Sequence, residues 1–151
     1  MSSLVQVGLV GAAVLTLGVG CKPKEETVSP TVTLEVALRG NAESNGGRPL
    51  QVVVRRTDAV SFFEDRYAAI EALVTKPDDS VLGVFVVFPG AVAYGEIEVE
   101  AGEPAIGVYG LFANPEGEDW KVLVEGAGVV DLVVDQGRLL DDEGLTEMFG
   151  G

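Results

Sequence analysis

The sequence predicts a mainly β fold, a two-sheet antiparallel β-sandwich with one inserted amphipathic helix. Three observations support it. Several short segments place apolar residues at every second position, glycine- and proline-containing turns separate them at regular spacing, and one stretch changes to helical spacing. A length of 151 residues and a hydrophobic content of 47% fit a single packed domain.

Two strands open the predicted sandwich. Residues 31–39 alternate strictly, and the expected inward face consists of Val32, Leu34, Val36 and Leu38. Residues 40–49 (GNAESNGGRP) are polar and rich in glycine and asparagine, which predicts a loop. The second strand follows over residues 50–56, with Leu50, Val52 and Val54 expected to face inward.

One helix is expected after the second strand. Ser61 and Glu64 have the spacing of a capping box, with Ser61 as the N-cap. Apolar residues then recur at helical spacing, namely Phe63, Tyr67, Ile70 and Val74. The helix should end near Lys76, just before a proline, and Phe62 and Phe63 should pack it onto the sandwich.

The remaining strands are expected over residues 84–88, 95–101, 105–113, 120–124 and 130–134. Gln136 and Gly137 could close a hairpin onto residues 138–140, which gives seven or eight strands in all. Trp120 alternates in register with the apolar side of its strand and is expected in the core. Glu96 and Glu98 are expected on an exposed face.

Composition argues against several functional classes. The chain has no His, which excludes His-based triads and His-ligated metal sites, and a single Cys, which excludes an internal disulfide. A net charge of −14 makes binding to nucleic acid unfavourable. The acidic run 141–143 lacks the spacing of calcium ligands. We therefore expect no enzyme activity, no cofactor, no metal and no nucleic-acid partner.

The N-terminus has the pattern of an export segment. Residues 1–20 carry no charged side chain, residues 4–20 are almost entirely apolar, and a polar stretch starts after Cys21. The small residues Gly18, Val19 and Gly20 before Cys21 resemble a bacterial lipobox. That resemblance implies cleavage before Cys21 and acylation of its thiol and new amine, so that acyl chains would hold the protein to a membrane. An uncleaved anchor or a buried apolar segment are the alternatives.

The predicted organisation has four parts: a signal peptide over residues 1–20, the lipidated Cys and a tether over 21–30, the sandwich over 31–140 and an acidic tail over 141–151. Charge is unevenly distributed along these parts. Residues 22–60 hold 6 basic and 5 acidic side chains, whereas residues 61–151 hold 4 basic and 19 acidic ones. The simpler explanation is that the acidic residues lie on solvent-exposed strand faces and loops. The alternative is an acidic surface that attracts a basic partner.

Several segments together, in their order, resemble a known family. They are Asn41 and the GRPLQV stretch 47–52, SFFED at 61–65, FPG at 88–90, IGVYGLF at 106–112 and DWKV at 119–122. The chain resembles the outer-membrane lipoprotein of the bacterial type VI secretion system, the TssJ family, over about residues 31–125.

The resemblance implies a transthyretin-like sandwich with a helical insertion and a location on the periplasmic face of the outer membrane. It also implies binding to the periplasmic domain of the inner-membrane protein TssM and, through it, an indirect link to TssL. The family contacts TssM through the loop between the first two strands. That loop corresponds here to residues 40–49, with the candidate contact residues Asn41, Ala42, Glu43, Ser44, Asn45 and Arg48.

Read without the resemblance, the loop is equally an ordinary solvated connection, and Arg48 could pair with a carboxylate of its own domain. Our leading hypothesis is a lipid-anchored structural protein that tethers TssM to the outer membrane. The alternative is a periplasmic lipoprotein that binds a glycan or a peptide, for which 3 Tyr and 1 Trp offer little aromatic material.

Overall fold

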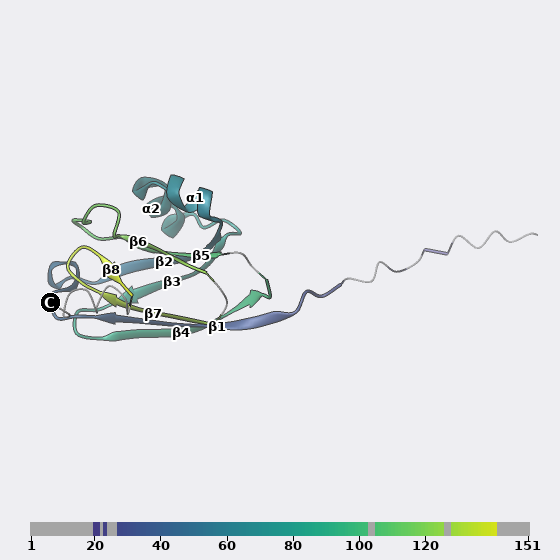
Figure 1. Ribbon diagram of the computed structural model, residues 1–151, viewed down its shortest axis with the longest axis horizontal. Helices are drawn as coiled ribbons and strands as arrows, with labels where there is room; N and C mark the ends of the chain where they lie inside the picture. Colours follow the sequence, from purple (N-terminus) through teal and green to yellow (C-terminus); the bar gives the residue numbers. More distant parts are fainter. Residues whose placement is uncertain (1–19, 22, 24–26, 103–104, 126–127, 142–151) are drawn as a thin grey trace, which may run out of the picture.

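Eight β-strands, two α-helices and one short 3₁₀-helix form the part of the chain that the computed structural model describes, namely residues 20, 21, 23, 27–102, 105–125 and 128–141 (Figure 1). The strands are β1 (Thr31–Gly40), β2 (Leu50–Thr57), β3 (Val81–Val87), β4 (Val92–Glu100), β5 (Ala105–Gly110), β6 (Lys121–Val124), β7 (Val129–Val134) and β8 (Leu139–Leu140). The helices are η1 (Ser44–Gly47), α1 (Ala59–Glu64) and α2 (Tyr67–Thr75).

The strands form two four-stranded sheets with the orders β4-β1-β7-β8 and β3-β2-β5-β6. The predicted two-sheet sandwich is confirmed, and so is the final hairpin, in which β8 pairs with β7. One pairing differs from the antiparallel expectation, because β1 and β7 run parallel. A hairpin between two consecutive strands would force them to run antiparallel. β7 follows β6, which lies in the other sheet, so no hairpin joins β7 to a neighbour before it and it can run parallel to β1.

The core lies between the two sheets and is built by the alternating strands. Leu34, Val36 and Leu38 of β1 are fully buried, as are Leu50 and Val52 of β2. Trp120 is 4% exposed and belongs to the hydrophobic core as predicted, although its ring packs against Tyr67 and Tyr109 and not between the sheets. Burial of one such apolar side chain stabilises the fold by about 1.5–3 kcal/mol.

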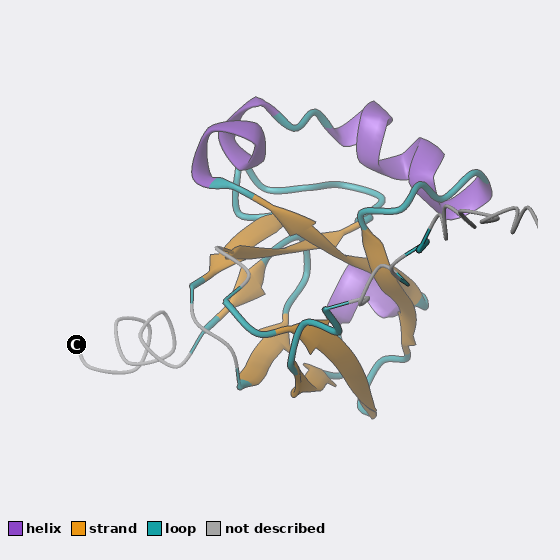
Figure 2. Ribbon diagram, turned by 90° about the vertical axis from the view of Figure 1, so that its right-hand side faces the viewer, coloured by secondary structure: helices purple, strands orange, loops and turns teal. Residues whose placement is uncertain are grey.

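The helices cover the outer face of the β3-β2-β5-β6 sheet (Figures 1 and 2). Val53 and Tyr109 are neighbours on that outer face, and both are fully buried. Phe62 of α1 packs on Tyr109 with ring centroids 5.7 Å apart, and Ile70 of α2 is fully buried. The second sheet therefore buries apolar side chains on both faces, whereas the outer face of the β4-β1-β7-β8 sheet carries no covering element in the described residues.

The single predicted helix is wrong, because the segment forms two helices separated at Asp65 and Arg66, whose backbones are extended. The Asp65 carboxylate accepts hydrogen bonds from Arg55 and from Tyr109, at 3.1 and 2.5 Å. Its backbone carbonyl accepts one from Lys121 at 3.1 Å. These contacts with the sheet outweigh the helical periodicity of the local sequence.

The helix start also differs from the prediction. The N-cap is Asp58, not Ser61, and its carboxylate accepts from the backbone N–H and the hydroxyl of Ser61 at 2.9 and 2.7 Å. Phe62 packs on the sheet as expected, but Phe63 is 75% exposed. The predicted end is confirmed, since α2 stops at Thr75.

Glu96 and Glu98 are exposed on β4, as predicted. Residues 1–19, which carry most of the expected signal peptide, lie outside the described residues, and so does most of the expected acidic tail, at residues 142–151. Residues 22 and 24–26 of the polar stretch after Cys21 and the turn residues 103–104 and 126–127 also lie outside them.

Candidate partner-binding site

The loop between β1 and β2 has a backbone that only a few residue types adopt easily. Asn45, Gly46 and Gly47 follow one another with φ values of 50°, 63° and 76°. This left-handed conformation costs most residues roughly 1–2 kcal/mol, whereas glycine adopts it freely and asparagine tolerates it. The Asn-Gly-Gly sequence therefore sets the path of this loop.

The Asn45 side chain points into the molecule and bridges two segments. Its Nδ2 donates to the carbonyl of Pro49 at 3.0 Å, and its Oδ1 accepts from the backbone N–H of Ala113 at 2.8 Å. Asn45 is 7% exposed, and the neighbouring Ser44 is fully buried. Asn45 thus holds the loop in place, and neither of these two candidate contact residues forms its outer surface.

Asn41 also holds the loop. Its Nδ2 donates to Asp135 Oδ1 at 2.5 Å, and its Oδ1 accepts from the backbone N–H of Glu43 at 3.0 Å. Partial burial disfavours the charged form of Asp135, but hydrogen bonds from Asn41 and from the backbone of Gln136, together with Arg138, lower its pKa below the usual 3.8. Asp135 is consequently an ionised anchor for the loop at neutral pH.

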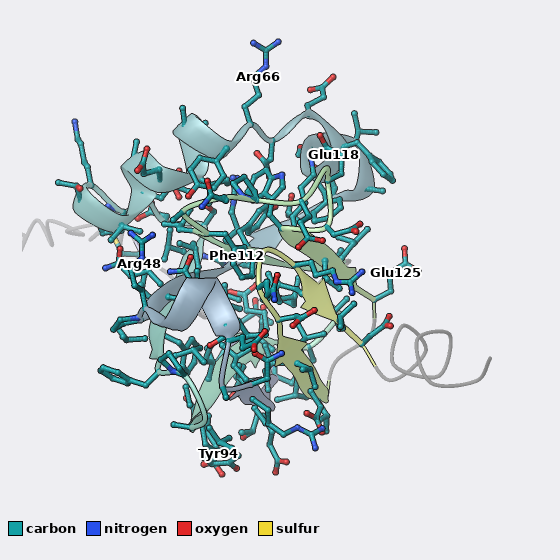
Figure 3. The ribbon with its side chains drawn as sticks, turned by 90° about the vertical axis from the view of Figure 1, so that its left-hand side faces the viewer. Arg48, Arg66, Tyr94, Phe112, Glu118 and Glu125 are labelled. Atoms are coloured by element: carbon teal, nitrogen blue, oxygen red, sulfur yellow. The ribbon has the colours of Figure 1, made fainter. Side chains whose placement is uncertain are left out.

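Ala42, Glu43 and Arg48 form the exposed part of the candidate set. Glu43 Oε2 accepts from Gln136 Nε2 at 2.9 Å. Arg48 forms no ion pair with any described residue, and Figure 3 shows its side chain at the periphery of this end of the molecule. A guanidinium in that position is open to a carboxylate of a partner.

Three loops meet at this end of the sandwich and enclose an open hollow of about 710 Å³. They are the β1–β2 loop, the β5–β6 loop and the β7–β8 turn, and the lining residues are Ala42, Glu43, Gly46, Gly47, Asn114, Pro115, Glu116, Gln136 and Gly137. Sequence reasoning recognised all three segments as loops or turns but not that they form one surface. No single-sequence signal could have shown this, because the contacts are long-range.

Gly137 is the point of closest approach between two of these loops. A Cβ atom there would lie 2.4 Å from the backbone oxygen of Asn114. The backbone N–H of Glu116 donates to the Gly137 carbonyl at 2.9 Å. The hollow therefore depends on the absence of a side chain at position 137.

A second polar cluster lies beneath the helices. Lys121 Nζ donates to the backbone carbonyls of Phe62, Phe63 and Asp65 at 3.0, 3.3 and 3.1 Å. Its side chain is 3% exposed, and the nitrogen lies 5.1 Å from the Phe62 ring centroid. A cation is favoured at the C-terminal end of a helix, so Lys121 fixes α1 on the sheet.

Tyr109 and Asp65 complete that cluster. Burial, followed by the hydrogen bond to the Asp65 carboxylate, raises the pKa of Tyr109 well above 10, so the phenol stays neutral. Because the polar groups bond to one another, we assign this cluster a structural role.

Cys21 is an exposed free thiol. The described residues contain no group of three or more metal-ligating side chains that could hold an ion. None of the described helices is long and apolar enough to cross a membrane.

The described residues thus form a β-sandwich with a loop-lined hollow at one end, and loops carried by such a scaffold commonly serve recognition. The sequence profile of the family described as "IglE, N-terminal domain" matches residues 51–133. The chain belongs to this family, which is a family of type VI secretion lipoproteins, and the resemblance to TssJ-type lipoproteins is thereby confirmed.

Solved structures share the fold. A structure described as the type VI secretion protein TssM C-terminal domain from EAEC superposes with a TM-score of 0.59 at 18% identity, covering 72% of this chain and 95% of that chain. Lip from Serratia marcescens, described as a membrane-bound type VI secretion component, gives a TM-score of 0.58 at 15% identity, with the same coverage of 72% and 95%. The type VI secretion lipoprotein TssJ1 from Pseudomonas aeruginosa gives 0.53 at 13% identity, covering 74% and 95%. No curated protein sequence matches the chain.

Proposed function

We propose that the protein is a lipid-anchored structural component of a type VI secretion membrane complex. Acylated Cys21 holds it to the periplasmic face of the outer membrane. The loop end binds the periplasmic domain of a TssM-type inner-membrane protein and is thereby linked indirectly to TssL. The family membership and the shared fold support a role in this membrane complex.

The placement of the two attachment points carries the proposal. β1 begins at Thr31, on the side from which the N-terminal segment enters, and ends at Gly40, where the candidate loop begins (Figure 1). Ten strand residues span about 30 Å. A pull between lipid and partner would therefore run along β1, which is hydrogen-bonded to β4 on one side and to β7 on the other.

The distance from the lipid to the sandwich also fits. Nine residues, 22–30, lie between Cys21 and β1. Fully extended, they reach about 30 Å. The sandwich would thus stand clear of the lipid surface and present its loop end toward the periplasm.

The hollow favours a protein partner over the alternative of a glycan ligand. None of the nine residues that line it is aromatic, whereas sugar sites commonly stack on aromatic rings. Its walls carry Glu43 and Glu116, with Arg48 nearby in the same loop as Glu43. We propose no enzymatic activity for this arrangement.

The contact is tested by a double charge swap, Glu43→Lys with Arg48→Glu, which keeps the net charge. Asn41 and Asn45 are left intact because they hold the loop, and Ser44 because it is buried. The control swap, Glu71→Lys with Arg66→Glu, changes exposed residues of the helical segment. We expect a TssM-type protein to co-purify from detergent-solubilised envelopes with the unchanged chain and with the control, but not with the loop variant. Equal recovery with all three would refute the loop as the contact.

The anchor is tested separately with Cys21→Ser. Incorporation of labelled palmitate should be lost, and the protein should leave the membrane fraction. Labelling that persists in this variant would refute acylation at Cys21, independently of the outcome at the loop.

A further inference from the structure

β4 is an edge strand whose outward residues form a distinct surface, which we call the β4 edge and define by Val92, Tyr94, Glu96, Glu98 and Glu100. These residues alternate along the strand and all are exposed. Figure 3 shows the Tyr94 side chain projecting away from the sandwich, on the side opposite Arg66 of the helical segment. Since β4 pairs only with β1 among the described strands, its other backbone edge is open.

One half of the β4 edge is apolar. Val92 and Tyr94 are each 60% exposed. On the opposite sheet the outward-facing Val53 and Tyr109 are fully buried, because the helices cover them. The apolar half of β4 has no equivalent cover in the described residues.

The other half is acidic, and although the Tyr94 hydroxyl donates to Glu96 Oε1 at 3.1 Å, no cation among the described residues compensates its charge. Glu96 lies directly opposite Glu35 of β1, and like charges facing each other across a strand pair destabilise a sheet. Glu98 and Glu100 face Thr33 and Thr31, which bring no positive charge. Among the described residues, none of the ion pairs involves these glutamates.

Charge decides which partner fits. A second copy pairing antiparallel over the whole of β4 would place Glu96 against Glu96 and Glu98 and Glu100 against Tyr94 and Val92. That pairing supplies no cation to any of the glutamates, and each chain carries a net charge of −14. Anionic lipid headgroups and nucleic acids are repelled in the same way. A strand with Lys or Arg at alternate positions would instead place each cation beside a carboxylate, because both strands repeat every second residue, at about 6.8 Å.

We propose that the β4 edge binds an extended, positively charged segment of a partner protein by strand addition. The backbone edge supplies hydrogen bonds, the glutamates select cationic side chains, and Val92 and Tyr94 contact apolar residues of the same segment. Val92 lies near the start of the β1–β2 loop, but none of the residues that define the β4 edge lines the hollow or belongs to the candidate contact set. The inference therefore does not rest on the proposed contact with a TssM-type protein.

The test uses the full chain in a neutral detergent at physiological ionic strength and a fluorescein-labelled peptide of alternating Lys and Val as the probe. The variant Glu96→Gln/Glu98→Gln/Glu100→Gln should weaken binding about tenfold, as expected for the loss of three cross-strand charge pairs. The matched control, Glu64→Gln/Glu71→Gln/Glu125→Gln, changes the net charge equally at exposed sites on other elements. It should change the affinity less than twofold.

Hydrogen exchange supplies the second measurement. Amides of β4 should become protected when the peptide binds, while those of β6, the edge strand at the far side of the other sheet, should not. Equal weakening by both triple variants would show attraction by net charge alone and would overturn the proposal. Binding without new protection on β4 would overturn it as well.

Discussion

Asn41 and Asp135 lie 94 positions apart in sequence, yet the Asn41 amide donates to the Asp135 carboxylate at 2.5 Å. The contact follows from the parallel pairing of β1 and β7, in which Gly40 is the register partner of Val134. The next residue of each strand is therefore brought to the same end of the sandwich. This hydrogen bond, like the one from Gln136 to Glu43, joins two of the three loops that enclose the hollow.

Asn41→Ala is expected to lower the free energy of unfolding by about 1.5–3 kcal/mol at pH 7, because the bond is to a charged carboxylate. The native pKa of Asp135 is lowered from 3.8, so its contribution is present above that value and is lost as the pH falls through the native pKa. The difference between wild type and variant should therefore be constant above about pH 5 and shrink toward pH 3.

Urea unfolding at several pH values measures this difference. Asn114→Ala serves as the control, since this exposed side chain makes no hydrogen bond with the described residues. Its effect should be small and independent of pH. A gap between wild type and Asn41→Ala that stays unchanged down to pH 3 would contradict the role of the ionised Asp135.

Asn45 combines a left-handed backbone with two side-chain hydrogen bonds, and two substitutions separate these contributions. Asn45→Gly removes the two side-chain hydrogen bonds but leaves the backbone unstrained, and should lower the free energy of unfolding by about 1–3 kcal/mol. Asn45→Ala also removes the bonds and in addition places alanine in the left-handed region, which should lower the free energy of unfolding by about 1 kcal/mol more. Thermal or urea unfolding of both variants checks the order, and an alanine variant as stable as the glycine variant would contradict it.

The sequence predicted the sandwich because its strands alternate and its turns carry strong local signals. It failed where tertiary contacts decide the local structure. The periodicity of residues 61–74 fits one helix, but the bonds of Asp65 to Arg55, Tyr109 and Lys121 break it in two. None of these partners is close in sequence, so no local pattern could reveal the break.

The candidate site was predictable only in part. The position of the β1–β2 loop follows from its composition, and the family resemblance suggested its role as a contact. Which of its residues point outward was not predictable, because Ser44 and Asn45 look like ordinary polar loop residues and are buried by segments far along the chain. The β7–β8 turn was recognised as a turn, but its part in the hollow depends on the unforeseen parallel pairing.

Lys121→Met should destabilise the fold strongly. The substitution keeps an apolar stem but leaves the carbonyls of Phe62, Phe63 and Asp65 without their buried donor. We expect a loss of about 2–4 kcal/mol in the free energy of unfolding. The control Lys76→Met, at an exposed position, should stay within about 0.5 kcal/mol of wild type. A loss at Lys121 no larger than this control would contradict its role in holding α1.

Gly137→Ala tests whether the shape of the hollow, rather than its charges, is needed for binding. The added methyl group would lie 2.4 Å from the Asn114 carbonyl oxygen, so the β5–β6 loop and the β7–β8 turn must separate. The expected cost in stability is about 1–3 kcal/mol. Gly83→Ala on β3 is the matched control, because the three atoms nearest its Cβ are side-chain atoms of Ile97 and Phe85, the closest at 3.3 Å. If the loop end binds the TssM-type protein, co-purification should fall for Gly137→Ala at a temperature where both variants are folded, and should persist for Gly83→Ala. Full recovery with a folded Gly137→Ala protein would mean that the partner does not use the hollow, and the contact would then be limited to the outer surface of the β1–β2 loop.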